Sequence, residues 1–490
     1  MVGAGFGGLG AAVELTRRGA RVVVCEALGY PGGCASTFRR RGYAFEAGAT
    51  LFSGFAPDQL FGRWIAELEL PVTVDFLDPI VELRAPSFRL PVPLDRAALV
   101  DALCRFPGAP EGRLRAFFAY QRKIADVLWS LFDDPTLLPP FDAAAVARHA
   151  LRSPRYLPLL PLLGRPLGEL LARRGLEGFA PLRTYLDAVC QITVQCSAAE
   201  AEAPFALAVM DYFYRGTGHV RGGIGVLAGA LAAAVTRLGG EVHLANAVKA
   251  VRPAPGGFEI VTRRGTLHAG AVVANLLPQG LRRLLGAEPG VLPGLDRLAA
   301  RVEEGWGAAM LYLVVTPPEG ADEGAHHLEI VQDPGAPFIE GNHLFASISG
   351  ARDAGRAPPG LRTITVSTHL PMAKLRALDG AGQAAYVAAV QARMRAGLEA
   401  HAPEWVRRVE HAETASPRTF ERFTGRFAGY VGGVPRRAGL GNYASLWPSP
   451  VLPDLYLVGD SVFPGQSTLA TAVGGTRVAE RIARGLGLAA

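Results

Sequence analysis

The chain has 490 residues, of which 49% are hydrophobic and 19% are charged, a composition typical of globular rather than disordered proteins. The formal net charge is +6, and no run of Lys or Arg indicates a nucleic-acid partner. The length predicts two or three domains. Uncharged apolar runs such as 224–235 are shorter than the roughly 18 residues of a spanning helix, so we expect none.

The cysteine and histidine patterns predict neither a disulfide framework nor a metal site. The number of cysteines is odd, their spacing is irregular and no CxxC occurs, so we expect reduced thiols in a cytosolic protein. The five cysteines are Cys25, Cys34, Cys104, Cys190 and Cys196. His326 and His327 are adjacent rather than four residues apart, which makes them poor metal ligands.

The elements change character along the chain. Residues 3–10 predict a turn, 11–18 a helix and 21–26 a buried parallel strand. Helical patterns follow over 95–130, and a glycine-led helix is expected over 222–238. Short strand signals occupy 241–278, and four β-rich runs over 308–369 predict an antiparallel sheet. A helix over 381–400, a strand ending at Gly459 and a helix over 469–485 complete the prediction.

A glycine fingerprint opens the chain. Gly3, Gly5 and Gly8 form GxGxxG before the first helix, where the glycines allow a tight turn, a close approach to a pyrophosphate and tight helix packing. Glu26 ends the next strand, 23 residues after Gly3, and is placed to accept hydrogen bonds from both ribose hydroxyls of an adenosine. Together these residues predict a dinucleotide site.

The start of the chain departs from this pattern. The first strand should precede Gly3, but only Met1 and Val2 remain. A doubly wound sheet places that strand at its centre, and two residues cannot supply about five. We therefore expect the native chain to begin upstream of Met1, or the chain to have been shortened.

The loop after Glu26 is more specific than a generic nucleotide-binding unit. It reads GYPGGCASTFRRRGYAFEAGATLF and resembles the phytoene-desaturase and carotenoid-isomerase branch of FAD-dependent oxidoreductases. In that family this loop wraps the FAD phosphates, and the GAT turn approaches the flavin. The resemblance implies an FAD shell of Gly32, Gly33, Ser36, Thr37 and Arg39, with Gly48, Ala49 and Thr50 near the isoalloxazine.

The C-terminal stretch LYLVGDSVFPGQSTLATAVGG also resembles this family. Gly459 and Asp460 end a strand, which places the carboxylate where a ribityl hydroxyl can donate to it. The helix that follows, with Leu469, Ala470 and Thr471 in its first turn, would aim its positive end at the flavin and stabilise the anionic reduced form. The cofactor expected is non-covalent FAD.

The middle motif YRGTGHVRGGIG completes the expected cofactor and substrate shell. By resemblance, the backbone of Val248 would meet adenine, and Asn275 ends the return strand of the same domain. His219 and Arg221 are the ionisable groups expected nearest the flavin and the candidates for catalysis, although a loop-packing histidine and a surface arginine explain them equally well.

The expected fold is α/β, with a discontinuous Rossmann-like FAD-binding domain and an α+β substrate domain that contains an antiparallel sheet. The FAD-binding domain would comprise 1–60, 218–280 and 425–490, and the substrate domain 61–217 and 281–424. The resemblance is weak over 60–200 and 285–420, where the substrate is chosen.

The two end motifs resemble most closely the desaturases that act near the end group of an acyclic carotenoid. This implies an FAD-dependent carotenoid desaturase with an apolar polyene substrate and an electron acceptor such as quinone or oxygen. Three alternatives stay open: a carotenoid cis–trans isomerase or retinol-saturase-like reductase that uses reduced FAD, an amine or small-molecule oxidase, and a flavin-free escort module for prenylated proteins.

A lipid-soluble substrate also favours peripheral association with a membrane. The stretch 155–182 mixes Leu and Pro with four Arg, a profile typical of an interfacial element, although a buried helical hairpin fits equally well. We therefore expect a cytoplasmic protein that docks on membrane surfaces through its substrate domain.

Overall fold

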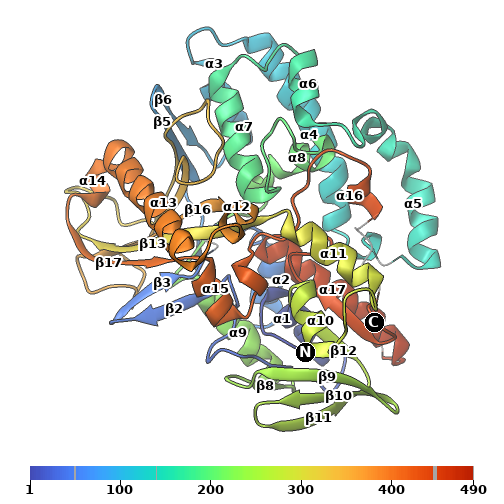
Figure 1. The fold of residues 1–490 in the computed structure, drawn as a ribbon. Coiled ribbons are helices and arrows are strands. Elements are labelled where there is room, and N and C mark those ends of the chain that lie inside the picture. The colour runs from blue at the N-terminus through green and yellow to red at the C-terminus, as the bar shows by residue number, and fades with distance from the viewer. Residues whose placement is uncertain (49–50, 140, 445–449, 489–490) are drawn as a thin grey trace.

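The computed structural model describes residues 1–48, 51–139, 141–444 and 450–488, whose arrangement is shown in Figure 1. Segments from both ends of the chain build one parallel sheet. Its strands are β1 (Val23–Cys25), β8 (Glu241–His243), β12 (Val272–Asn275) and β18 (Leu455–Val458). β1 pairs with β8, and β12 pairs with β18, both in parallel.

Val2 joins these two pairs. It forms parallel bridges to Cys25 of β1 and to Ala274 of β12, so it stands at the centre of the sheet. The amide of Val2 donates to the carbonyl of Val273, and the amide of Cys25 donates to the carbonyl of Met1. The expected first strand is therefore represented by a single bridging residue.

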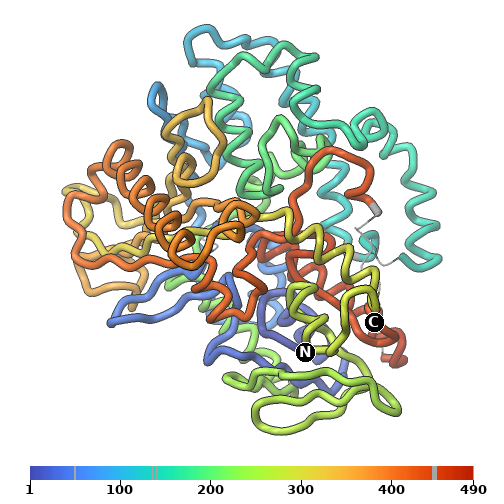
Figure 2. Tube along the Cα trace, in the orientation of Figure 1, coloured from blue at the N-terminus to red at the C-terminus, as the bar shows by residue number. Residues whose placement is uncertain are grey.

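Three helices cover the parallel sheet: α1 (Phe6–Arg17), α9 (Ile224–Arg237) and α17 (Thr468–Gly485). Figure 2 shows α1 and α17, from the blue and red ends of the chain, lying side by side. A Cβ on Gly475 would come within 2.1 Å of the Gly7 carbonyl oxygen. Helix α1 begins before the predicted 11–18 because close packing against α17 outweighs the poor helix propensity of its glycines.

A small antiparallel sheet extends below the parallel one in Figure 1. It comprises β9 (Val248–Ala254), β10 (Gly257–Thr262) and β11 (Gly265–Ala269), followed by α10 (Pro278–Leu285) and α11 (Pro293–Glu303). Apolar side chains of β9, β10, β12 and β18 share one core with α10. The strand signals predicted over 241–278 thus divide between two sheets.

The largest sheet has seven strands in the order β17, β13, β16, β15, β14, β5, β6. Their bounds are β17 Val409–Ala415, β13 Trp306–Val315, β16 Arg362–Pro371, β15 His343–Ile348, β14 His326–Val331, β5 Val81–Ala85 and β6 Phe88–Val92. The four runs expected over 308–369 pair antiparallel, as predicted. β5 joins β14 in parallel, which the sequence did not indicate.

The two faces of this sheet differ. One face carries Leu311, Ile330 and Val366, which pack with α13 (Gly380–His401) in a dry core. Because strand side chains alternate, the neighbouring residues point to the other face. That face carries Phe345 and meets a layer of helices drawn in teal and green in Figure 1.

The helical layer comprises α3 (Arg96–Cys104), α4 (Glu111–Phe132), α5 (Ala143–Tyr156), α6 (Leu167–Arg173), α7 (Ala180–Thr193) and α8 (Ala203–Val209). The stretch 155–182 is neither a hairpin nor one element: it spans the end of α5, the 3-10 helix η2 (Leu157–Leu162), α6 and the start of α7. No helix in the described ranges is both long enough and apolar enough to cross a membrane.

The remaining elements connect these layers. They are β2 (Thr37–Arg40), β3 (Tyr43–Glu46), α2 (Leu60–Glu67), β4 (Val74–Asp75), η1 (Pro135–Leu137), η3 (Tyr212–Tyr214), β7 (His219–Val220), α12 (Met372–Arg376), α14 (Pro403–Val406), α15 (Pro417–Thr424), η4 (Phe427–Gly429) and α16 (Gly441–Ala444). The β2–β3 hairpin packs through Phe38 and Phe45 against Tyr312 of β13, so it ties the first segment of the chain to the large sheet.

Candidate functional site

A cavity of about 630 Å³ lies where the carboxyl ends of β1, β12 and β18 meet the large sheet and the helices α4, α7 and α8. In doubly wound folds, ligands bind beyond this edge of the parallel strands. Twelve residues expected in the cofactor shell line the cavity: Gly3, Gly5, Glu26, Gly32, Gly33, Gly48, Val248, Asn275, Gly459, Asp460, Ala470 and Thr471.

The three fingerprint glycines have distinct structural roles. Gly3 has a φ of +93°, which favours glycine in the tight turn. A Cβ on Gly5 would lie 2.3 Å from Asn275 Nδ2, so a side chain there would displace the amide. A Cβ on Gly8 would lie 2.2 Å from the Gly3 carbonyl oxygen, so Gly8 packs the helix on the turn and does not line the cavity.

Glu26 is held firmly at the edge of the cavity. Its Oε2 accepts a hydrogen bond of 2.7 Å from the Ala4 amide, and its Oε1 accepts one of 2.8 Å from the Leu28 amide. Burial raises the pKa of Glu26, and these backbone donors oppose that shift. Each carboxylate oxygen keeps a free lone pair, so the group can still accept from a ligand hydroxyl.

Three predicted shell residues hold loops rather than line the cavity. Ser36 Oγ donates to the Gly33 carbonyl at 2.7 Å, and Arg39 donates to the Gly355 carbonyl at 3.0 Å. Thr37 Oγ1 donates to Glu46 and accepts from the Gly225 amide at 2.9 Å. Of their partners, Gly33 lines the cavity, so Ser36 holds part of the wall in place. Two further predicted residues, Ala49 and Thr50, lie outside the described residues.

The C-terminal motif supplies a second polar edge. Asp460 Oδ2 accepts a hydrogen bond of 2.7 Å from Arg426 Nη2, and both residues line the cavity. Helix α17 is capped by Ser467, whose hydroxyl accepts from the Ala470 amide at 3.0 Å. The predicted residue Leu469 does not line the cavity but packs in the core behind it.

Several buried polar atoms of the wall lack a partner among the described residues. Gln195 Oε1, Gln466 Oε1 and Thr468 Oγ1 make no hydrogen bond, although buried polar groups are normally paired. A Cβ on Gly432 would lie 2.3 Å from Gln195 Oε1 and 2.9 Å from Gln466 Oε1, so the two amides converge on one spot. A ligand that carries N–H or O–H groups, such as FAD, can donate hydrogen bonds to these acceptor atoms and to the carboxylates of Glu26 and Asp460.

The part of the wall formed by the helices and the large sheet is mostly apolar, although β16 adds Ser367, Thr368 and His369 to it. Its apolar residues are Leu128, Trp129, Phe132, Ile192, Phe205, Ala208, Val209, Ala308, Met310 and Phe345. These side chains offer shape and burial but few hydrogen bonds. The cavity therefore combines a polar edge at the parallel strands with an apolar extension.

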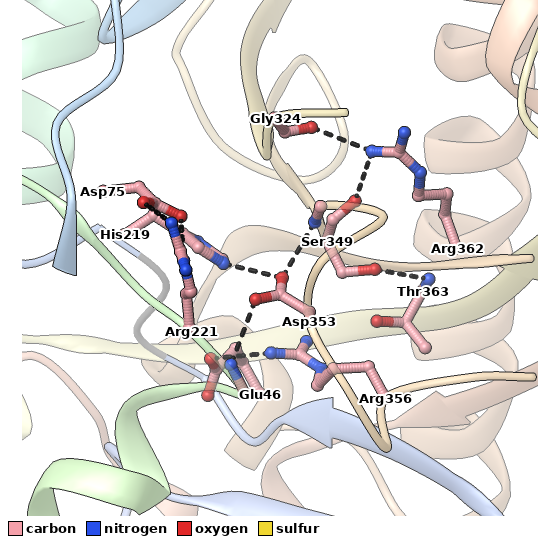
Figure 3. A network of polar contacts seen from close by, with 12 residues as sticks. Glu46, Asp75, His219, Arg221, Gly324, Ser349, Asp353, Arg356, Arg362 and Thr363 are labelled. Atoms are coloured by element: carbon pink, nitrogen blue, oxygen red, sulfur yellow. Dashed lines mark hydrogen bonds and ion pairs between the residues drawn. The ribbon is translucent and has the colours of Figure 1, made fainter. Parts of the chain in front are cut away.

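The structure does not bring the two expected catalytic candidates to this cavity. Neither His219 nor Arg221 lines it. Figure 3 shows both in a polar network, where His219 Nε2 lies 2.7 Å from Asp353 and Arg221 donates two hydrogen bonds to Asp75. Burial alone would raise the pKa of Asp353, but the His219 hydrogen bond and charge lower it to about 2. His219 thus ties β7 to the segment between β15 and β16, and Arg221 ties the end of β7 to β4.

Sequence reasoning missed His369, Arg426 and Gln195, which all line the cavity. His369 lies near the end of β16 on the same side as Ser367, and burial lowers its pKa to about 4, so its imidazole is neutral at pH 7. The alternation of the β-rich run could have placed His369 and Ser367 on one face, but not on the cavity side. Gln195 and Arg426 follow helices and carry no local motif.

Known proteins resemble this chain both in fold and in sequence. A solved oxidoreductase from Methanosarcina mazei has the same fold, with a TM-score of 0.63, 18% identity and coverage of 98% of this chain and 99% of that chain. The chloroplastic prolycopene isomerase of Arabidopsis thaliana is 26% identical over 528 residues, which cover 100% of this chain and 83% of the relative.

A third relative matches only part of the chain. The hydroxyneurosporene desaturase of Cereibacter sphaeroides is 31% identical over 175 residues, which cover 35% of this chain and 34% of the relative. The resemblance to carotenoid isomerases and desaturases is therefore confirmed. The family of flavin-containing amine oxidoreductases matches residues 6–483. The chain belongs to this family, and it is an FAD-dependent oxidoreductase with the two-part α/β fold that its sequence predicted.

Proposed function

We propose that this enzyme acts on an acyclic carotenoid and isomerises cis double bonds to trans with reduced FAD. The observation that carries the proposal is that the polar cofactor edge and the apolar extension belong to one continuous cavity. A polyene has few polar groups, so shape and apolar burial must bind it, at roughly 25 cal/mol per Å².

The choice of isomerisation rests on the extent of the similarity. The prolycopene isomerase matches the whole chain, including the helices and the large sheet that line the apolar wall. The desaturase match covers about a third of the chain. Substrate-contacting segments are therefore better represented in the isomerase match.

Desaturation, the reaction predicted from the two end motifs, is the second candidate. The desaturase match, although shorter, has the higher sequence identity, 31% against 26% for the isomerase match. A desaturase would need oxidised FAD and an electron acceptor such as quinone or oxygen to restore it. A retinol-saturase-like reduction would need reduced FAD and would add two hydrogens to the substrate.

We assign the cofactor contacts to the residues at the polar edge. When bound, FAD supplies a ring that accepts or donates a hydride. Glu26 would accept from the adenosine ribose, Gly3 and Gly5 would approach the pyrophosphate, and Asp460 would accept from the ribityl chain. These roles belong to the expected FAD-binding domain of 1–60, 218–280 and 425–490, with 61–217 and 281–424 as the substrate domain.

A membrane surface is the proposed source of the substrate. Exposed apolar side chains gather on α5 and η2, where Val146, Leu151, Leu157 and Leu160 are 57%, 83%, 61% and 59% exposed. Arg155 is exposed beside them. The rest of the stretch 155–182 packs into the core through Leu167, Leu171, Leu176 and Leu182, so the interfacial element we propose is 146–160.

The redox state of the flavin separates the candidates. The enzyme is incubated anaerobically with a cis acyclic carotenoid in liposomes, once with oxidised and once with pre-reduced flavin. Isomerisation predicts a product of unchanged mass that forms only with reduced flavin. A product that has lost two hydrogens while oxidised flavin bleaches would overturn isomerisation in favour of desaturation, and a product that has gained two hydrogens would favour reduction.

A further inference from the structure

Arg436 is a buried cation in the wall of the cavity. The residue is 6% exposed, and its guanidinium lies over the ring of Phe205 from α8, 5.6 Å from the ring centre. Its side chain makes no hydrogen bond and no ion pair with any described residue. The residues outside the described ranges include no Asp or Glu. The described part of the chain therefore offers this cation no anionic partner.

Other buried arginines of the protein have the partners that Arg436 lacks. Arg84 donates to Glu82 at 2.9 Å. Arg356 donates to Glu46 at 3.1 Å. A third buried arginine, at the start of β16, donates to two backbone carbonyls at 2.8 and 2.9 Å. Because a buried charge without a partner is costly, Arg436 indicates a ligand that completes its environment.

The nearest charges do not neutralise Arg436. Glu202 acts on it through charge, but the Glu202 carboxylate already accepts from the Gly164 amide at 3.0 Å and from the Tyr443 hydroxyl. Arg301 is a second cation whose charge acts on it. Burial, with the charge of Arg301 adding to it, lowers the pKa of Arg436 to about 10, so the guanidinium stays positive at pH 7.

Two unpartnered acceptors adjoin this cation. Gln195 follows the residue whose carbonyl accepts from the Arg436 amide at 2.9 Å. Gln466 follows Gly465, where a Cβ would lie 3.3 Å from Arg436 Nη2. Both side-chain amides donate to the Ile192 carbonyl, so their nitrogens are fixed there and their unpaired oxygens remain as acceptors. Gln195, Arg436 and Gln466, together called the Arg436 site, offer one positive charge and two acceptors.

The place of the Arg436 site in the cavity favours the FAD ring as its ligand. Asp460 is assigned to the ribityl chain, and Gly465 and Gln466 follow it along the wall before α17 begins. The polyene of the proposed function carries no charge and would leave the cation unpaired. The reduced FAD ring carries negative charge and more N–H groups than the neutral oxidised ring, so the site matches the reduced form better.

We propose that Arg436 is the counter-ion of the reduced FAD ring and that Gln195 and Gln466 accept hydrogen bonds from it, so that the cavity binds reduced FAD more tightly than oxidised FAD. This inference deepens the proposed isomerisation and rests on it, because that reaction keeps FAD reduced. Tighter binding of the reduced form raises the midpoint potential of bound FAD. A tenfold preference corresponds to about 30 mV for a two-electron couple.

Redox titration of the FAD-loaded protein, followed by flavin absorbance without substrate, tests the inference. Arg436→Met removes the charge and should reduce the preference for reduced FAD at least tenfold, so the midpoint potential should fall by at least about 30 mV. Arg436→Lys keeps a positive charge and should retain most of the wild-type potential. Arg437→Met is the matched control: its side chain is 37% exposed and lies outside the cavity, and the potential should equal that of the wild type.

Two further measurements separate a ligand contact from a structural role. With oxidised FAD bound, Arg436→Met should melt no lower than the wild type, because its side chain has no hydrogen bond or ion pair to lose. Gln466→Met removes one acceptor and should also lower the potential, which keeps the inference testable if Arg436→Met fails to fold. A wild-type potential in Arg436→Met, or in Gln466→Met when only that variant folds, would overturn the inference.

A carboxylate on the substrate is the alternative anion. If oleate binds the wild type more tightly than Arg436→Met while the potentials are equal, Arg436 recognises an acid group of the substrate and the inference is wrong. A wild type that isomerises no polyene in either flavin state would overturn the proposed function. The potentials are measured without substrate, so they still decide the role of Arg436 in that case.

Discussion

Single residues define the polar edge of the cavity, and Glu26 is the one whose contacts are best determined. We predict that Glu26→Ala lowers FAD affinity by about 10- to 100-fold, since a hydrogen bond to a charged group contributes roughly 1.5–3 kcal/mol. The amides of Ala4 and Leu28 also lose their acceptor, so thermal stability should fall as well. Flavin absorbance per protein after gel filtration measures the first effect.

The control for Glu26 is a neighbouring carboxylate outside the cavity. Glu241 begins the adjacent strand β8, and its side chain is 64% exposed. Glu241→Ala should retain full flavin content. Equal flavin content in Glu26→Ala and Glu241→Ala would contradict the assignment of Glu26 to the cofactor.

Glu329 gives a pH dependence of stability that can be measured on the folded protein alone. Its pKa is raised from 4.5 to about 8, so between these values the folded state keeps a proton that the unfolded state has lost. The free energy of unfolding therefore falls as the pH rises through this window. Glu329→Gln cannot ionise, and above pH 8 it should be more stable than the wild type by about 1–3 kcal/mol.

Thermal melts at pH 6 and pH 9 check this prediction. The advantage of Glu329→Gln should grow between the two values, whereas Glu399→Gln, which changes an exposed glutamate of α13, should follow the wild type at both. At acidic pH the buried histidines His343 and His369 determine the trend. Burial lowers both pKa values, so the unfolded state binds protons first and the free energy of unfolding decreases as the pH falls below 6.5. A constant difference between Glu329→Gln and wild type would contradict the raised pKa.

The sequence predicted the residues of the site unevenly, and the reason is physical. Gly3, Gly5, Glu26 and Asp460 stand in local motifs whose spacing is set by one turn or one strand end, so a short stretch of sequence is enough to recognise them. His369 reaches the cavity only through the pairing of β16 with β13 and β15, which depends on residues far apart in the chain. No local pattern encodes that neighbourhood.

At the scale of elements, local patterns again predicted the structure well, whereas pairings between distant segments could not be predicted. The helices over 222–238, 381–400 and 469–485 were predicted within a few residues, because strong periodicity or a glycine boundary marks each one. The pairing of β5 with β14 was not predicted, since a parallel neighbour 246 residues away, as for Glu82 and Leu328, leaves no trace in either strand's own pattern. Burial within 155–182 likewise depends on which turn of each helix meets the core.

The element with the clearest testable surface is α5 together with η2. Replacing Leu151 and Leu157 by Glu should lower liposome binding by at least about 10-fold, because burial of each leucine contributes roughly 1.5–3 kcal/mol. Flotation with anionic vesicles measures the bound fraction. Val291→Glu changes an equally exposed apolar residue between α10 and α11 and should float like the wild type. Equal flotation of all three proteins would exclude this surface as the docking element.

At the scale of the whole molecule, a buried network ties the first segment of the chain to the large sheet (Figure 3). Arg356, between β15 and β16, donates to Glu46 at 3.1 Å and to the Ala44 carbonyl at 2.8 Å. Glu46 also accepts from the Ile224 amide at the start of α9. One guanidinium thus connects the β2–β3 hairpin, α9 and the sheet that forms the cavity wall.

We predict that Arg356→Met destabilises the protein by about 3–5 kcal/mol, because both side chains of the ion pair are 3% exposed and removal of the cation leaves a buried carboxylate behind. Adding Glu46→Gln should recover part of that loss, since the leftover charge is then removed while the amide can still meet Ile224. Arg352→Met, whose side chain is 55% exposed, should change stability by less than about 0.5 kcal/mol. Denaturant unfolding of the wild type, Arg356→Met, Glu46→Gln and the double variant gives the coupling energy, and strictly additive losses would show that Arg356 and Glu46 do not act as a pair.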